Sequence, residues 1–225
     1  MKIGILQTGH VADEIRSMLG DYSDMFVRLL NGHGFDFVVY NVVDMDFPAG
    51  PELCDGWLIT GSRHGAYEDH PFIPPLEALI RAIQETGRPL IGVCFGHQII
   101  AQALGGKVEK FAGGWSVGRQ EYTFDGETVA LNAWHQDQVV DLPPGAKVVA
   151  SSAFCANAAL VYGPRIFTVQ AHPEFTSSMV EGLIAHRSAK VPDALRDHAR
   201  NALPTPTDNQ RLASRMAAVL KGETQ

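Results

Sequence analysis

Residues 92–98 read Gly-Val-Cys-Phe-Gly-His-Gln. The apolar run 89–93 leads directly into Cys94, and a helical pattern of apolar residues follows it until the Gly-Gly pair at 105–106. This pattern predicts a tight strand-to-helix turn with glycine two residues on either side of Cys94, as in a nucleophile elbow. The positive end of the following helix favours the thiolate form of such a cysteine. The stretch therefore predicts a catalytic cysteine at the edge of an α/β sheet.

The composition is that of an ordinary globular chain, and it excludes several classes of function. Hydrophobic residues make up 45% of the 225 residues, and 18 basic against 25 acidic residues give a formal net charge of −7. No basic block stands out, so neither nucleic acid nor an anionic membrane is an expected partner. No apolar stretch approaches the roughly 18 residues that a membrane span needs. Three cysteines without a secretion signal indicate a cytoplasmic protein.

Strands alternate with helices in the first half of the chain, and short glycine-rich turns join them. This order predicts a three-layer, doubly wound and mostly parallel α/β sheet. From about Val108 the pattern changes to strands and turns, which predicts antiparallel additions to the sheet. The last two of these strands form a predicted hairpin with its turn at Gly163-Pro164.

We expect one domain over residues 1–190, in which residues 9–20 form a polar loop. Residues 191–225 are expected to form a helical extension that packs on the domain or on a partner. The sequence Thr207-x-x-Gln210 resembles a capping box at the start of the last helix. The apolar stripe of that helix consists of Leu212, Met216, Val219 and Leu220.

A nucleophilic cysteine needs a base, and the base needs an orienting group. His172 and Glu174 follow the apolar strand 166–170, and residues two apart in an extended segment face the same side. The strand ends of an α/β sheet converge on one edge, so we expect this pair to act on Cys94. The carboxylate would hold the imidazole in one tautomer.

The oxyanion of an acyl intermediate needs hydrogen-bond donors as well. The backbone N–H of Phe95, the residue after the nucleophile, is one candidate. The turn Thr60-Gly61-Ser62 follows a neighbouring strand and is placed to supply the second. Two backbone N–H groups are therefore expected beside the thiol of Cys94.

No cofactor and no metal are expected. The chain has no P-loop sequence, and no pair of its nine histidines shows ligand spacing with supporting cysteines or carboxylates. The polar residues of the loop after residue 62 are interpreted as a solvated loop; they include Arg63, His64, Glu68 and Asp69. Trp57, Trp115 and Trp134 are interpreted as packing residues.

The candidate catalytic residues carry a family resemblance. The elbow at 92–98, together with His172-Pro-Glu174, resembles the triad-type class I glutamine amidotransferases, and most closely the glutaminase domain of GMP synthase. The segment 134–139, Trp-His-Gln-Asp-Gln-Val, resembles the Ser-His-Gly-Asp-Lys-Val segment of that domain. The resemblance covers about residues 1–188 in order, and it implies the flavodoxin-like fold of that family.

The resemblance also implies a reaction. In this reaction Cys94 attacks the γ-amide of glutamine, ammonia leaves, and water releases glutamate from a γ-glutamyl thioester. His172 is implied as the base and then the acid, with Glu174 orienting it. Ser62 and Phe95 are implied as the sources of the oxyanion amides. The residues implied for glutamine binding are Gly61, Gly96, Gln98, Gln136 and Asp137.

Two other functions stay open at this point. Ser62 stands where the family has the second glycine of the oxyanion turn, and Gln136 stands where it has a glycine after the histidine. No synthase domain follows in the sequence, and this chain also resembles the stand-alone γ-glutamyl peptidases of the same superfamily. These enzymes use the same thioester to cleave γ-glutamyl peptides or glutathione conjugates. The other alternative is a glutaminase or regulatory subunit that needs a synthase partner.

Overall fold

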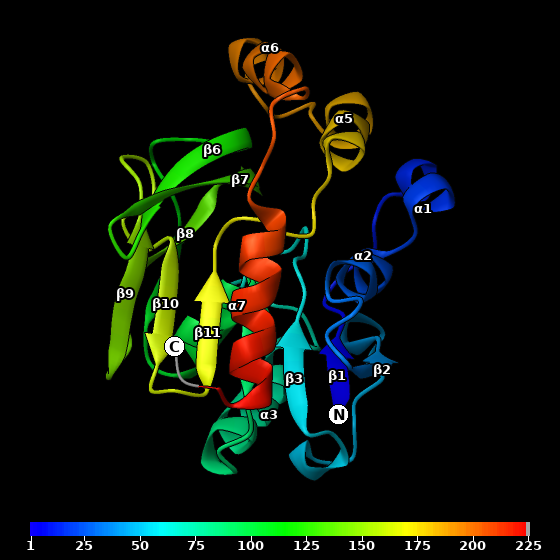
Figure 1. The fold of residues 1–225 in the computed structure, drawn as a ribbon, viewed down its shortest axis with the longest axis vertical. Helices are drawn as coiled ribbons and strands as arrows, with labels where there is room; N and C mark the ends of the chain where they lie inside the picture. Colours follow the sequence, from blue (N-terminus) through cyan, green and yellow to red (C-terminus); the bar gives the residue numbers. More distant parts are fainter. Residues whose placement is uncertain (224–225) are drawn as a thin grey trace.

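The computed structural model describes residues 1–223, in which nine strands form one sheet and two more form a small second sheet (Figure 1). The strands are β1 (Lys2–Leu6), β2 (Asp36–Tyr40), β3 (Gly56–Ile59), β4 (Leu90–Val93), β5 (Lys107–Lys110), β6 (Ser116–Phe124), β7 (Glu127–His135), β8 (Asp137–Asp141), β9 (Ala146–Ser151), β10 (Ala159–Tyr162) and β11 (Ile166–Val169). The helices are α1 (Asp13–Leu19), α2 (Tyr22–Leu29), α3 (Ile73–Glu85), α4 (Phe95–Ala103), α5 (Ser177–His186), α6 (Asp193–Ala202) and α7 (Asn209–Lys221), with short 3-10 helices η1 (Val42–Asp44) and η2 (Pro51–Leu53). None of the helices within residues 1–223 is long and apolar enough to cross a membrane.

The large sheet has the strand order β2-β1-β3-β4-β11-β10-β9-β6-β7. The first five strands of this order are parallel to one another. The other four extend the sheet as antiparallel neighbours, and β5 pairs separately with β8. The predicted hairpin is present, since β10 and β11 are antiparallel with Tyr162 opposite Ile166. The prediction of a mostly parallel sheet with antiparallel additions is confirmed.

Each central strand divides its side chains between two apolar layers, because successive residues of a strand point to opposite faces. In β3, Leu58 belongs to the layer with α2 and α7, whereas Trp57 and Ile59 belong to the layer with α3 and α4. Figure 1 shows α7 on the near face of the sheet and α3 on the far face. The result is the predicted three-layer arrangement, with helices on both faces.

Helix α7 completes one of these layers by packing against β4 and β11. Its predicted apolar stripe is buried there: Leu212, Met216, Val219 and Leu220. The predicted capping box at Thr207 is wrong, because the cap residue is Asp208 and its side chain does not cap the helix. Its carboxylate instead accepts a hydrogen bond from the Ala130 N–H of β7 at 2.7 Å. A long-range contact thus replaces the local one that the sequence pattern indicated.

The expectation of a polar loop over residues 9–20 is also wrong, since most of this stretch forms α1. Ile15 is the buried residue of this helix, and it packs against α5 at Gly182. A seven-residue helix with one buried position has no apolar periodicity that a sequence can reveal. The contact with α5 therefore determines that α1 forms.

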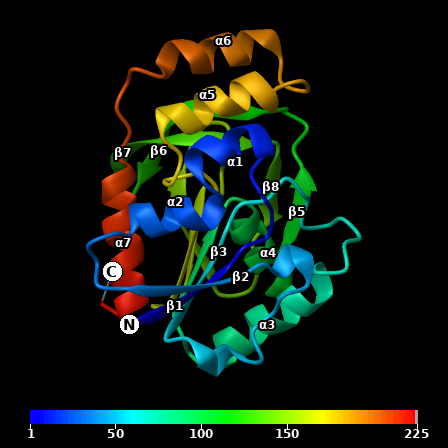
Figure 2. The same cartoon turned by 90° about the vertical axis from the view of Figure 1, so that its right-hand side faces the viewer.

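Helices α1, α5 and α6 lie beyond the end of the sheet at which β3, β4 and β11 finish (Figures 1 and 2). They share a third apolar cluster that is separate from the two layers of the sheet. Its buried members include Ile15, Met179, Val180, Leu183 and Ala199. This arrangement covers one side of the strand ends where the predicted catalytic residues are found.

Candidate active site

Cys94 stands between the last residue of β4 and the first residue of α4. Its backbone has a φ of +53°, a conformation that residues other than glycine rarely adopt. The flanking glycines are required by close backbone contacts. A Cβ at Gly92 would lie 2.5 Å from the Gly96 carbonyl oxygen, and a Cβ at Gly96 would lie 2.3 Å from the Ile59 carbonyl oxygen. The strand–turn–helix bend predicted from the sequence is therefore present.

His172 and Glu174 follow β11, which lies beside β4, so they emerge at the same edge of the sheet as Cys94. His172 Nδ1 is 2.7 Å from Glu174 Oε1, and both side chains are buried. The His172 ring stacks on the Phe175 ring with centroids 3.8 Å apart. The His172 backbone N–H donates to the Asn132 carbonyl oxygen at 2.8 Å. These contacts fix the ring through Nδ1, and Nε2 is the ring nitrogen left to interact with Cys94.

Gly61 lies beside the side chains of His172 and Cys94. A Cβ there would lie 3.0 Å from His172 Cε1 and 3.7 Å from Cys94 Cβ. Burial lowers the pKa of His172, but the Glu174 carboxylate and the Cys94 thiolate outweigh it and raise that pKa to about 10. This environment favours the imidazolium form of His172, which can give a proton to a neighbouring group.

The two predicted oxyanion donors follow β4 and β3, which are neighbouring strands. Phe95 is the first residue of α4, so its backbone N–H has no acceptor within the helix. Ser62 follows β3, the other neighbour of β4. Its hydroxyl donates to the Thr8 carbonyl oxygen at 2.7 Å and accepts from the His64 N–H at 3.2 Å. The Ser62 side chain thus ties the oxyanion turn to the end of β1.

A cavity of about 400 Å³ opens beside Cys94 and His172. Three of the five residues predicted for substrate binding line it, namely Gln98, Gln136 and Asp137. The other two, Gly61 and Gly96, are not in the cavity wall. A Cβ at Gly61 would meet the His172 ring and one at Gly96 would meet the backbone of β3, so both glycines lie within the packing that supports the wall.

Gln98 and Asp137 are held by polar contacts. Gln98 Nε2 donates to the Asp137 carbonyl oxygen at 2.9 Å and to Gln170 Oε1 at 3.2 Å. The Asp137 carboxylate accepts from the Tyr67 hydroxyl at 3.1 Å, and burial raises its pKa. The hydrogen bond from Gln98 to Asp137 thereby joins helix α4 to strand β8 at the cavity.

Sequence reasoning missed much of the cavity wall. Several lining residues were not connected with Cys94, among them Tyr22, Lys110, Trp115, Trp134, Arg187 and Lys190. Trp115 and Trp134 were interpreted as packing residues; both do pack against the third apolar cluster, and both also line this wall. The only sequence signal was the position of Trp134, directly before the segment that was predicted to bind substrate. The others reach the cavity through the packing of α2, β5, β6 and α5.

A second group of side chains meets at the rim of the cavity. His64, Glu68 and His70 lie in the loop between β3 and α3, although no metal site was expected from their spacing. Burial, followed by the neighbouring His70 and Arg63, lowers the pKa of His64. His64 and Glu68 also line the cavity beside Cys94.

Comparison with known proteins identifies the family of the chain. Residues 35–188 match the family model described as glutamine amidotransferase class-I. The chain belongs to the class I glutamine amidotransferase family. The family resemblance predicted from the elbow and the later His-Pro-Glu is therefore confirmed, and the matched range includes Cys94, His172 and Glu174.

Relatives of this family member include proteins of two kinds. Over 74% of its length the chain is 30% identical to γ-glutamyl peptidase 3 of Arabidopsis thaliana, and the match covers 74% of that protein. Over 65% of its length it is 32% identical to the glutamine-hydrolyzing GMP synthase of Cupriavidus taiwanensis, of which the match covers 30%. A glutamine amido transferase from Methylobacillus flagellatus has a crystal structure that matches the whole chain and 95% of its own, with a TM-score of 0.76 and 25% identity. The predicted fold is confirmed.

Proposed function

We propose that this class I glutamine amidotransferase hydrolyses a γ-glutamyl amide bond through a thioester on Cys94. The Cys94 sulfur attacks the γ-carbonyl carbon, the C–N bond breaks, and the leaving nitrogen takes the proton held by His172. A water molecule then gives a proton to His172 while its oxygen attacks the thioester carbon. The C–S bond breaks, glutamate leaves, and the thiolate is restored. Glu174 stabilises the imidazolium through Nδ1.

The observation that carries this proposal is the hydrogen bond of 2.7 Å between His172 and Glu174, directly beside the strained elbow of Cys94. The carboxylate fixes the tautomer of His172 and raises its pKa, which supports proton transfer to and from Nε2. The backbone N–H groups of Ser62 and Phe95 support the proposal as oxyanion donors. Each such donor typically contributes about 3–4 kcal/mol to stabilising the transition state.

A γ-glutamyl peptide is a second candidate substrate, and the cavity favours it over glutamine. A volume of about 400 Å³ falls within the roughly 300–1,000 Å³ of pockets that hold drug-sized ligands, whereas glutamine is much smaller than such a ligand. Trp115 and Trp134 offer apolar surface to a larger leaving group. Arg187 and Lys190 offer positive charge to its carboxylate, and within residues 1–223 neither makes an ion pair.

The experiment that tests the proposal is steady-state hydrolysis by the purified protein, with glutamine compared against γ-glutamyl-cysteinyl peptides. We expect peptide cleavage with a kcat/KM at least about tenfold above that of glutamine, a difference of about 1.4 kcal/mol. Turnover of glutamine alone would favour a glutaminase, and turnover only after addition of cell extract would favour a glutaminase subunit that needs a synthase partner. No turnover of any γ-glutamyl compound, with or without extract, would overturn the proposal.

The positively charged residues of the cavity wall, Arg187 and Lys190, give a sharper test of the peptide substrate. Replacing Arg187 by glutamine is expected to raise KM about 3- to 10-fold for a γ-glutamyl peptide with a free terminal carboxylate, because a charge-assisted contact is lost. Cleavage of the same peptide with an amidated terminus should not change. The matched control is Arg200→Gln, which removes an exposed arginine of α6 outside the cavity. Equal effects on both peptides would exclude Arg187 as a carboxylate contact.

A further inference from the structure

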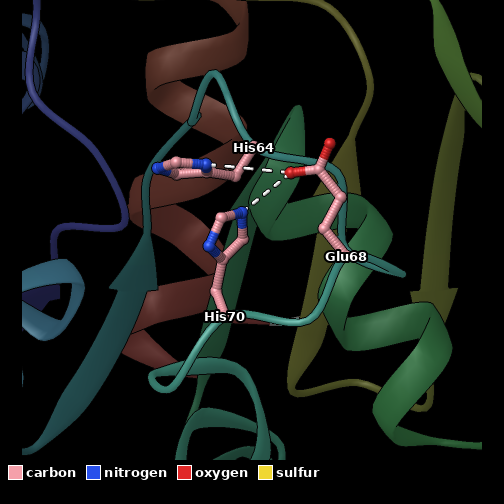
Figure 3. A group of neighbouring side chains, drawn as sticks. All are labelled: His64, Glu68 and His70. Atoms are coloured by element: carbon pink, nitrogen blue, oxygen red, sulfur yellow. Dashed lines mark hydrogen bonds and ion pairs between the residues drawn. The ribbon is translucent and has the colours of Figure 1, made fainter.

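The loop between β3 and α3 directs three side chains at one point (Figure 3). His70 Nε2 lies 2.8 Å from Glu68 Oε2, and His64 Nδ1 lies 3.8 Å from the same oxygen. The donor atoms of all three residues lie within 4.8 Å of one another. Figure 3 shows both imidazole rings turned toward the carboxylate. Two imidazole nitrogens and a carboxylate oxygen thus lie close enough together to share one cation.

We propose that His64, Glu68 and His70 bind a divalent transition metal of the Zn²⁺ type. Zn²⁺ binds histidine nitrogen and carboxylate oxygen at about 2.0–2.2 Å, which places two tetrahedral ligands about 3.4 Å apart. The separations of 2.8 and 3.8 Å lie on either side of that value. Mg²⁺ and Ca²⁺ fit this set less well, because both prefer ligand sets made entirely of oxygen.

The two histidine ligands are held by contacts outside the cluster. The His70 ring stacks on Phe72 with centroids 5.8 Å apart, and the His64 ring lies at the same distance from Phe72. Phe72 is 2% exposed, and its ring packs against that of Phe95, the residue after Cys94. The ligand rings are thus supported by the apolar layer beneath them, which lowers the cost of ordering them around a cation.

The cluster is also connected to the oxyanion turn. The His64 N–H donates to Ser62 Oγ at 3.2 Å, so the first ligand lies two residues from a proposed oxyanion donor. A cation held by residues 64, 68 and 70 would tie this turn to the segment that begins α3. With three protein ligands, a fourth position remains for water or for a group of a ligand in the cavity. The bound metal would therefore lie at the rim of the cavity that contains Cys94.

The test is calorimetric titration of Zn²⁺ into the full chain carrying Cys94→Ser. This background is needed because the Cys94 thiolate and the His172 imidazole could otherwise bind Zn²⁺ themselves. We expect one equivalent to bind, and we expect His70→Gln or Glu68→Gln to weaken the affinity at least about tenfold. Co²⁺ is the second probe. In the same background its visible absorption bands should be those of a four-coordinate ion, and His70→Gln should abolish these bands.

The matched control is His198→Gln, which removes an exposed histidine of α6 that is not in the cluster. It should leave the Zn²⁺ affinity unchanged. Thermal unfolding without metal separates a folding defect from the loss of a metal ligand. Glu68→Gln is the variant less prone to a folding defect, because Glu68 is exposed. The proposal is overturned if the Cys94→Ser chain does not bind Zn²⁺ saturably, or if the folded Glu68 and His70 variants bind it as tightly as their parent.

Discussion

Replacing Cys94 by serine is expected to lower kcat/KM for γ-glutamyl amide hydrolysis by at least about 10⁴-fold. A serine hydroxyl is a weak nucleophile at its ordinary pKa, and the thiolate–imidazolium pair with His172 cannot form without the sulfur. Steady-state hydrolysis measures the loss. Mass spectrometry after an acid quench should detect a γ-glutamyl adduct on Cys94 in the parent protein and none in the variant.

The matched control for this prediction is Cys54→Ser. Cys54 is buried directly before β3, at the end of that strand opposite Ser62, and burial raises the pKa of its thiol. It does not line the cavity, so this variant should keep the parental activity. If Cys94→Ser kept more than about a tenth of the parental kcat/KM while folded, the thioester mechanism would be wrong.

Replacing Gly96 by alanine is expected to lower the free energy of unfolding by about 1–3 kcal/mol. The new Cβ would lie 2.3 Å from the Ile59 carbonyl oxygen, and neither backbone can move without separating α4 from β3. Denaturant unfolding monitored by circular dichroism measures the change. The KM of the protein that remains folded should stay close to the parental value, because Gly96 does not line the cavity.

Gly182→Ala is the matched control, since it also places a methyl group on a helical glycine. Its Cβ would lie 3.2 Å or more from the atoms of the Ile15 side chain, which can adjust, and alanine favours the helix. We expect the unfolding free energy to change little. An unchanged stability of Gly96→Ala together with a raised KM would contradict this prediction and support the substrate-binding role that the family resemblance implied for Gly96.

The elbow illustrates what local sequence can reveal. Gly92, Cys94 and Gly96 lie within five residues, and the conformation they require depends mainly on the strand before them and the helix after them. The pair His172 and Glu174 could also be predicted, because two residues in an extended segment share a face and parallel strands end at one edge. Both predictions depend on regular backbone geometry.

The cavity wall illustrates what local sequence cannot reveal. Trp115 precedes β6, while Arg187 and Lys190 follow α5, and no spacing connects them with Cys94. They reach the cavity because the α1–α5–α6 cluster packs over the strand ends. The metal-type cluster of His64, Glu68 and His70 is similar, since its spacing fits no regular element and ring packing on Phe72 brings it together.

The sequence by itself determined the family, the class of fold and the residues proposed for catalysis, because each depends on short patterns whose backbone geometry is regular. Only the tertiary structure decided that residues 13–19 form a helix, that Asp208 contacts Ala130, and that Gly96 supports the cavity wall without lining it. It also decided which aromatic and cationic side chains surround a substrate. These features arise from contacts between segments far apart in the chain, whose relative positions are set by the packing of whole layers.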